Sequence, residues 1–299
     1  MLHMVAKLHY EADMAQVDIA KKLGVSTATI SRLLQKARAV GIVRIEVIDL
    51  STPEEITTAL IAKLGLKQAQ VVDAPVSGGL GALVSAVDTM LKEAGLKTGS
   101  VLGIGWGRAI REVVGAGLPR IPGVVTVPMT GGMQQAAAHF QINEFVRQAA
   151  ERMGGTPHFL HAPYLPSPEL RDAFINDPTV REVLGLWDHL DAAIVGVGLP
   201  HAINPLEDRA ATANEKALSQ AAGDVIRHYI SEDGTLLDWD GEERMIAVSP
   251  AQLRATPLVI GIAATPEKAR GIIGAVRSGM INALATDTTT AQAILDLLD

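Results

Sequence analysis

Hydrophobic and polar positions follow two different patterns along this chain, and the change between them lies near residue 51. In the first fifty residues, apolar side chains recur every three or four positions, as in short amphipathic helices. Beyond residue 55, short apolar runs bounded by glycine or proline alternate with helical patterns, as in buried parallel strands joined by helices. We therefore expect two domains, covering residues 1–51 and 52–299.

The N-terminal segment predicts two helices joined by a three-residue turn. Gly24 ends the first helix, and Ser26 or Thr27 can cap the second, which runs until Gly41. After it, residues 42–48 alternate apolar and polar side chains and predict a β-ribbon or wing. The apolar positions of the two helices are Val17, Ile19, Ala20 and Leu23, then Ile30, Leu33, Leu34 and Ala37.

The outward face of the second helix carries short hydrogen-bonding side chains first and cations after them. A DNA recognition helix needs this order, because its first turns meet base edges while later cations reach phosphates. A helical hairpin with a solvated polar face is the plainer alternative. We predict a winged helix-turn-helix that binds double-stranded operator DNA, with Lys36 and Arg44 on phosphates. The predicted DNA contacts are Ser26, Thr27, Thr29, Ser31, Arg32, Lys36 and Arg44.

The charge is unevenly distributed between the two segments. The whole chain has a net charge of −7, but residues 1–50 carry +2 and the remainder −9. No acidic residue lies between Ile19 and Ile45, where six of the cations are found. A small basic module can neutralise phosphates, whereas DNA would repel the acidic body, which should serve another purpose.

The second segment predicts an α/β domain with a doubly wound, mostly parallel sheet. Helical patterns begin at 51–55 (STPEE) and at 167–169 (SPE), and another ends at Gly154. Ligands of such sheets bind beyond the carboxyl ends of the strands. The predicted strands are VLGIG (101–105), VVTVPM (124–129), AAIVGVG (192–198), LVIGIAA (258–264) and INALAT (281–286).

Two of these strand exits are rich in glycine. Gly103, Gly105 and Gly107 lead into a helix that starts near Arg108, where free backbone N–H groups favour an anion or a set of hydroxyls. Glycines that only allow tight packing are an equally good interpretation. At the second exit, the segment 130–132 (Thr-Gly-Gly) predicts another backbone cradle.

Two further positions combine a charge with a strand exit. Thr265 is expected as a helix N-cap, with Pro266 first and Lys268 third in the helix. A cation in the first turn of a helix opposes the helix dipole, and a bound anion would offset this unfavourable interaction, which favours an anion site. An exposed lysine with a small energetic penalty is the alternative. Asp224 is predicted to lie between a strand and a helix. There it can accept hydrogen bonds from sugar hydroxyls, or it can serve only as a helix N-cap.

Several classes of protein are excluded by what the sequence lacks. Without cysteine there is no disulfide, thiolate zinc site, iron-sulfur cluster or cysteine nucleophile. Gly-x-Ser-x-Gly, His-Glu-x-x-His and Walker motifs are absent, so we expect no enzyme, cofactor or metal, with His158 and His161 as packing residues. No signal peptide or long apolar run is evident, which predicts a soluble, cytoplasmic protein without a membrane partner.

In combination and order, these segments resemble the SorC-type sugar-binding bacterial transcriptional regulators, which include deoxyribonucleoside and central-glycolysis repressors. The resemblance covers nearly the whole chain. It implies a winged helix-turn-helix joined to an effector domain similar to phosphosugar isomerases and glucosamine-phosphate deaminases, usually tetrameric. The segments are DIAKKLGVSTATISRLLQKARAVGIVRI, GIGWGRAI, GGM, APYLPSPELRDAF, AIVGVG, AGDVIRHYISEDG and VIGIAATPEKARGIIGAVRSGMINALATD.

The resemblance also implies effector contacts. The loop 105–109 is similar to the family's anion- or hydroxyl-binding loop, Lys268 to its phosphate-side lysine, and Asp224 to an acid that contacts ligand hydroxyls. Three positions depart from the family's pattern. Thr130 stands where some members place lysine or arginine, Ala109 replaces a frequent Thr or Ser, and Ala-Ala at 263–264 replaces a frequent Gly-Gly. We therefore expect no covalent effector. The implied effector contacts are Gly105, Trp106, Gly107, Arg108, Ala109, Thr130, Gly131, Gly132, Asp224 and Lys268.

The leading hypothesis is a homotetrameric transcriptional regulator of a carbohydrate operon. A sugar, polyol or sugar phosphate in the second domain would modulate its binding to operator DNA; the resemblance leaves both a neutral and a phosphorylated effector open. The alternatives are a sugar-phosphate isomerase or deaminase fused to a DNA-binding module, and a structural DNA-organising protein without an effector.

Overall fold

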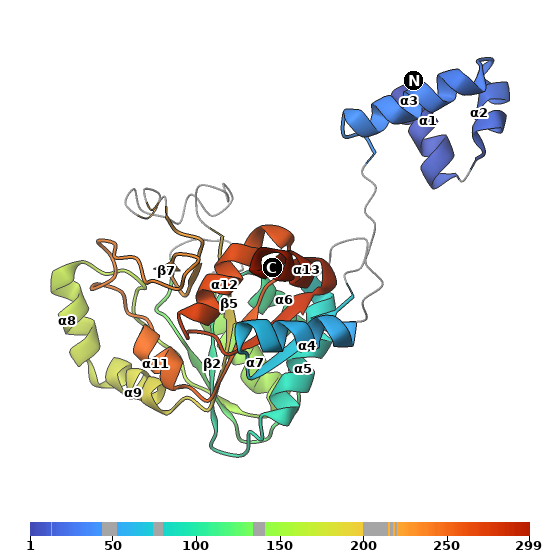
Figure 1. The fold of residues 1–299 in the computed structure, drawn as a ribbon. Helices are drawn as coiled ribbons and strands as arrows, with labels where there is room; N and C mark the ends of the chain where they lie inside the picture. The colour runs from blue at the N-terminus through green and yellow to red at the C-terminus, as the bar shows by residue number, and fades with distance from the viewer. Residues whose placement is uncertain are drawn as a thin grey trace. The chain divides into compact units, whose positions relative to one another are not determined.

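The computed structural model describes residues 1–12, 14–43, 53–73, 80–133, 141–199, 215, 218 and 220–299 of the chain. Two compact units, Met1–Leu50 and Ser51–Asp299, make up the structure (Figure 1). Each unit has a hydrophobic core of its own.

The N-terminal unit is helical over its described residues. Its elements are α1 (Leu2–Ala6), the π-helical turn η1 (Lys7–Glu11), α2 (Gln16–Leu23) and α3 (Thr27–Ala39). The core contains Val5, Ile19, Ala20, Ile30 and Leu34. The two predicted helices are confirmed, whereas α1, which supplies Val5 to the core, was not predicted. Residues 44–48 of the predicted wing, Arg44 included, lie outside the described residues.

A seven-stranded parallel sheet forms the centre of the second unit, in the order β1-β9-β8-β5-β2-β3-β4. Its strands are β1 (Gln68–Val72), β2 (Val101–Ile104), β3 (Val125–Pro128), β4 (Thr156–Pro157), β5 (Ala192–Gly196), β8 (Leu258–Ile262) and β9 (Ala283–Asp287). All five predicted strands are present. The edge strands were missed: β4 has only two residues, and β1 (QAQVV) mixes polar and apolar positions because it is less buried.

Helices cover both faces of this sheet (Figure 1), which confirms the predicted doubly wound architecture. The helices are α5 (Leu83–Glu93), α6 (Arg108–Ala116) and α7 (Ile142–Met153) on one face, and α4 (Pro53–Leu64), α9 (Pro178–Leu186), α11 (Pro250–Ala255), α12 (Ala269–Arg277) and α13 (Thr288–Leu298) on the other. Leu102 and Ile104 belong to the core between the sheet and α5–α7, whereas Val101 belongs to the core on the opposite face. Successive side chains of a strand point to opposite faces of the sheet. Within the described ranges, no helix is long and apolar enough to span a membrane.

Helix boundaries agree with the local signals in the sequence. Helix α4 begins at Pro53, and α8 (Pro168–Asn176) follows Ser167, as expected for proline in a first turn. Helix α7 ends before Gly154, whose φ of +76° is the left-handed conformation that glycine adopts most readily. The predicted caps at residues 51 and 52 lie outside the described residues.

The segment from Gly223 to Ile230 is a β-hairpin and not the predicted passage from strand to helix. Strands β6 (Gly223–Val225) and β7 (His228–Ile230) pair antiparallel across a two-residue turn. The turn residues Ile226 and Arg227 have φ values of +51° and +66°. The prediction was wrong because such turns are usually marked by glycine or asparagine, and this one has neither.

The prediction for the segment after β8 was also wrong in one respect. Thr265 precedes a 3₁₀ turn, η6 (Pro266–Lys268), and α12 starts only at Ala269, so Lys268 is the N-cap of α12. Thr265 has a φ of +102°, outside the extended conformation of N-cap residues, and its side chain makes no capping hydrogen bond. The short turn shifts the helix start by three residues.

Candidate functional site

The turn between α2 and α3 is built from glycine and serine. Gly24, with φ of +64°, ends α2 in the left-handed conformation, and Ser26 starts α3 as its N-cap. The Ser26 hydroxyl accepts a hydrogen bond from the Thr29 amide at 3.2 Å and lies 2.9 Å from the Thr29 hydroxyl. Two of the predicted DNA contacts are thus already hydrogen-bonded to each other.

The exposed face of α3 presents the remaining predicted DNA contacts of that helix. Ile30 and Leu34 are buried in the core, and Arg32, two residues from each, points to the opposite side of a 3.6-residue helix. Thr27, Ser31, Arg32 and Lys36 are all exposed. This surface has the geometry that a recognition helix needs, with a cation at its centre.

The strand order of the second unit creates one topological switch point. The chain runs from β2 outward through β3 to β4, then returns to place β5 on the other side of β2. The carboxyl ends of β2 and β5 are therefore adjacent, with Ile104 paired to Ile194. Loops that leave two such strands in opposite directions form the crevice in which α/β proteins bind their ligands.

The loop after β2 has the features of an anion- or hydroxyl-binding loop. The Gly105 amide donates to the Ile194 carbonyl at 2.8 Å, and a Cβ at Gly105 would lie 3.0 Å from that oxygen, so β5 packs directly against the loop. Gly107 is the N-cap of α6, and a Cβ there would meet nothing within 4 Å. No acidic side chain lies in the first turn of α6, where Arg108 is exposed and Ala109 buried. The positive end of the helix dipole thus faces an open side of the loop.

The loop after β3 does not form the predicted backbone cradle. The amide of Gly131 donates to the Ile246 carbonyl and that of Gly132 to the Ala162 carbonyl, both at 2.8 Å. The buried Thr130 hydroxyl also donates to Ile246. Because these donors already have acceptors, the two glycines serve close packing: a Cβ at Gly131 would lie 2.6 Å from backbone atoms of Pro163.

Asp224 lies at the switch point, beside the exit of β5. Its carbonyl accepts a hydrogen bond from the Gly198 amide at 2.9 Å, and its carboxylate lies where a Cβ of Gly198 would be. A second carboxylate oxygen accepts from the Arg227 amide at 2.9 Å, across the hairpin turn. The structure therefore brings Asp224 to the same strand end as the loop after β2, as the prediction of a shared site requires.

Arg227 is a buried charge that was not predicted as part of the site. Its guanidinium, 1% exposed, donates to Glu215 at 3.0 Å and to the Tyr229 hydroxyl at 3.1 Å, and lies 5.3 Å from the ring centre of Trp106. Burial alone would lower the pKa of Arg227, but Tyr229, Asp224 and Glu215 outweigh it and raise the pKa, so the group is charged. No local signal marks this residue, because Glu215 and the Trp106 ring lie on other segments of the chain. Arg227 connects the hairpin to the loop after β2.

Lys268 is held at the exit of β8 by a chain of hydrogen bonds. The amide of Thr265 donates to the Thr290 hydroxyl at 2.7 Å, and that hydroxyl donates to the Asp287 carboxylate at 3.0 Å. Asp287 is the N-cap of α13. This chain supports the unusual backbone at Thr265, and with it the turn that ends in Lys268. The lysine is half-buried at the N-terminus of α12.

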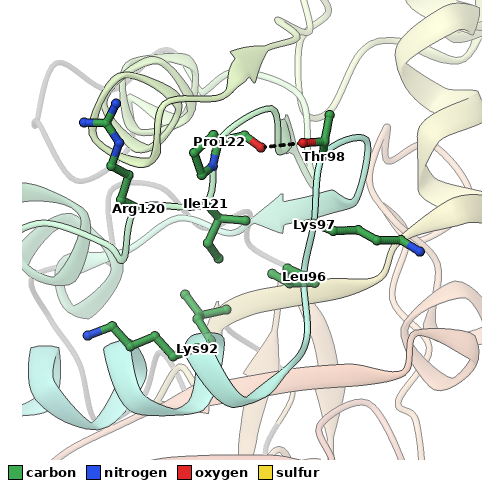
Figure 2. A pocket seen from close by; sticks show the side chains of 8 residues that line it. Lys92, Leu96, Lys97, Thr98, Arg120, Ile121 and Pro122 are labelled. Atoms are coloured by element: carbon green, nitrogen blue, oxygen red, sulfur yellow. Dashed lines mark hydrogen bonds between the residues drawn. The ribbon is translucent and has the colours of Figure 1, made fainter.

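A pocket of about 470 Å³ lies at the other end of the sheet (Figure 2). Its lining includes residues 96–98, which precede β2, and residues 120–122, which precede β3. The Thr98 hydroxyl donates to the Pro122 carbonyl at 2.9 Å across it. Because it lies at the amino ends of the strands, this pocket is separate from the predicted effector site. In the part of the chain that the structure covers, no cluster of three or more potential metal ligands is found.

Comparison with known proteins places the chain in a family. Residues 49–296 match the family model described as "Putative sugar-binding domain". The chain is 32% identical over 306 residues to the sorbitol operon regulator of Klebsiella pneumoniae, an alignment that covers 97% of this chain and 96% of that regulator. The chain belongs to the SorC-type family of sugar-binding transcriptional regulators.

A second relative and a crystal structure support this assignment. The deoxyribonucleoside regulator of Bacillus subtilis (strain 168) is 27% identical over 305 residues, which are 97% of this chain and 96% of that protein. The crystal structure of the full-length sorbitol operon regulator SorC from Klebsiella pneumoniae aligns with a TM-score of 0.76 and 31% identity over 100% of this chain and 98% of that one. The predicted family, fold class and regulatory rather than enzymatic role are confirmed by these relatives.

Proposed function

We propose that this SorC-type protein binds operator DNA through residues 1–51, and that a sugar, polyol or sugar phosphate bound within residues 52–299 alters that binding. The recognition surface is the exposed face of α3 around Arg32. The effector site lies at the exits of β2, β5 and β8. A carbohydrate catabolic operon in the bacterial cytoplasm is the proposed target.

The observation that carries this proposal is the switch point between β2 and β5. It brings the open N-terminus of α6 and Asp224 to one end of the sheet. A helix N-terminus favours an anion, and a carboxylate accepts hydrogen bonds from hydroxyls. The arrangement suits a polyhydroxylated ligand with or without a phosphate.

The charge distribution supports a division of labour between the two units. Residues 1–50 carry a net charge of +2, which favours phosphate contacts, while the remainder carries −9 and would be repelled by DNA. The effector can act on operator binding only through a difference in its affinity for the DNA-competent and DNA-incompetent states. Its site therefore has to change between those states.

The proposal is tested with DNA that the protein itself selects. Fragments enriched from a random-sequence library would be titrated at fixed salt, with and without sorbitol, mannitol, ribose, fructose and their phosphate esters. We expect at least one of these compounds to change DNA affinity several-fold. A protein that selects no sequence, or one that ignores every compound in both DNA binding and thermal stability, would contradict the proposal.

Lys268→Ala is expected to reduce affinity for a phosphorylated effector roughly tenfold or more, because a charge-assisted hydrogen bond to phosphate contributes about 1.5–3 kcal/mol. Binding of the matching neutral compound should stay within about twofold. The measurement is the concentration dependence of thermal stabilisation for sorbitol and sorbitol 6-phosphate. Arg270→Ala is the matched control, since Arg270 is exposed two residues further along and pairs with Glu232. An equal loss in both variants would argue against a phosphate site at Lys268.

A homotetramer is the proposed assembly, as implied by the resemblance to SorC-type regulators. Several copies would place several recognition helices on repeated half-sites of the operator. Light scattering coupled to size-exclusion chromatography measures this directly. A monomer at micromolar concentration would contradict it.

A further inference from the structure

Tyr164 has a buried hydroxyl group without a hydrogen-bond partner. The residue is 7% exposed, and among the described residues its hydroxyl oxygen is one of only a few buried side-chain polar atoms with no partner. Burial of an unpaired hydroxyl costs free energy, and phenylalanine would fill the same space without that cost. The hydroxyl is therefore expected to have a partner other than the side chains and backbone of the described residues.

The position of Tyr164 places it beside the proposed effector site. Its amide donates to the Gly132 carbonyl at 2.9 Å, and its carbonyl accepts from the Ile246 amide at 2.9 Å, so it is tied to the loop after β3. Burial raises the pKa of Tyr164; Glu215 and Asp224 raise it further, and Arg227 opposes them. The hydroxyl is therefore neutral. Tyr164 packs in one cluster with Tyr229, and Tyr229 pairs across the β6–β7 hairpin with Asp224, the predicted contact for ligand hydroxyls.

Tyr229 provides a direct comparison within the same cluster. Tyr164, Tyr229, Trp239 and Met245 form one small core, and Tyr229 is 1% exposed. The Tyr229 hydroxyl donates to Glu215 at 2.7 Å and accepts from Arg227 at 3.1 Å. Two buried tyrosines thus share one environment, but of the two hydroxyls only that of Tyr229 has a partner among the residues that the structure describes. The difference points to a ligand role for Tyr164.

We propose that the Tyr164 hydroxyl binds a hydroxyl group of the effector, and so extends the site at Asp224 to a second hydroxyl position on the ligand. The inference rests on the proposed function, because it assumes a polyhydroxylated effector at these strand exits. A neutral phenol can both donate to and accept from an alcohol, whereas the Asp224 carboxylate only accepts. The pair would favour a polyol or sugar over a carboxylate or a simple phosphate.

The test compares Tyr164→Phe with Tyr229→Phe in the full-length protein. Without any ligand, Tyr164→Phe should leave the melting temperature unchanged or slightly raised, whereas Tyr229→Phe should lower it by roughly 2–6 °C, because it leaves Arg227 and Glu215 each short of a partner. With sorbitol, mannitol, ribose, fructose and their phosphate esters, the compound that stabilises the wild type most should bind Tyr164→Phe about tenfold more weakly.

Each outcome bears on the inference separately from the proposed function. Unchanged affinity of Tyr164→Phe for a compound that stabilises the wild type would overturn the inference and leave the proposed function intact. A loss of stability in ligand-free Tyr164→Phe as large as that in Tyr229→Phe would also overturn it, because the hydroxyl would then have an internal or water partner. No stabilisation of the wild type by any of these compounds would contradict the proposed function, and the inference with it.

Discussion

Replacing Arg227 with methionine is expected to lower the free energy of unfolding by about 3–5 kcal/mol, because removing one partner of a buried ion pair leaves the other charge uncompensated. Glu215 is 3% exposed, so its carboxylate would stay in the core, still accepting the Tyr229 hydrogen bond but without the Arg227 guanidinium. Urea denaturation, followed by tryptophan fluorescence, measures the change through the midpoint and slope of the transition.

Two variants make the Arg227 experiment specific. The double variant Arg227→Met/Glu215→Leu should be more stable than Arg227→Met alone, because it removes the uncompensated carboxylate. Lys92→Met breaks an exposed ion pair with Asp88, 2.6 Å long, and should change stability by less than about 1 kcal/mol. If Arg227→Met were as mild as Lys92→Met, the buried pair would not be a structural element of the hairpin.

Arg32→Ala is expected to weaken binding to a selected operator sequence by about 1–3 kcal/mol, or about 5- to 150-fold, if the guanidinium contacts a guanine. Arg32 is exposed at the centre of the outward face of α3, directly opposite the buried Ile30 and Leu34. Fluorescence anisotropy at fixed salt, with the selected fragment and with random DNA, measures the loss and its sequence dependence.

Arg38→Ala is the matched control for Arg32. Arg38 is exposed on the same helix, but it lies next to the buried Ala37 and so at the side of the recognition face. We expect Arg38→Ala to weaken binding to the selected fragment and to random DNA by similar factors, as for a phosphate contact. Equal affinities of Arg32→Ala and the wild type for the selected fragment would remove Arg32 from the interface.

Local sequence signals were sufficient wherever a structure depends on neighbouring residues. Gly24 and Ser26 mark the turn between α2 and α3, and each acts as expected, one in the left-handed conformation and the other as an N-cap. The five predicted strands are buried apolar runs, and burial on both faces is what selects such runs in a parallel sheet. Proline at 53 and 168 begins helices because its missing N–H costs nothing in a first turn.

The same signals failed where distant contacts determine the backbone. The turn at Ile226 and Arg227 has left-handed φ values that neither residue favours. The Arg227 guanidinium binds Glu215 and lies over Trp106, and such contacts can hold a conformation that the local sequence opposes. The predicted cradle at Gly131 and Gly132 failed for a related reason, because their amides bond to carbonyls of remote segments.

Local patterns were enough to assign the class of this protein. The helix pair with its outward cations, the parallel strands and the family motifs are all produced by residues that are close in the chain. Which strand exits meet depends instead on the strand order of the folded sheet. The strand order places β5 beside β2, and so brings the loop at 105–107 to Asp224, more than a hundred residues later. The tertiary structure also decided which buried polar groups have partners: Arg227 is paired with Glu215, whereas the Tyr164 hydroxyl has no partner among the described residues. Such pairing depends on packing between segments that no local pattern encodes.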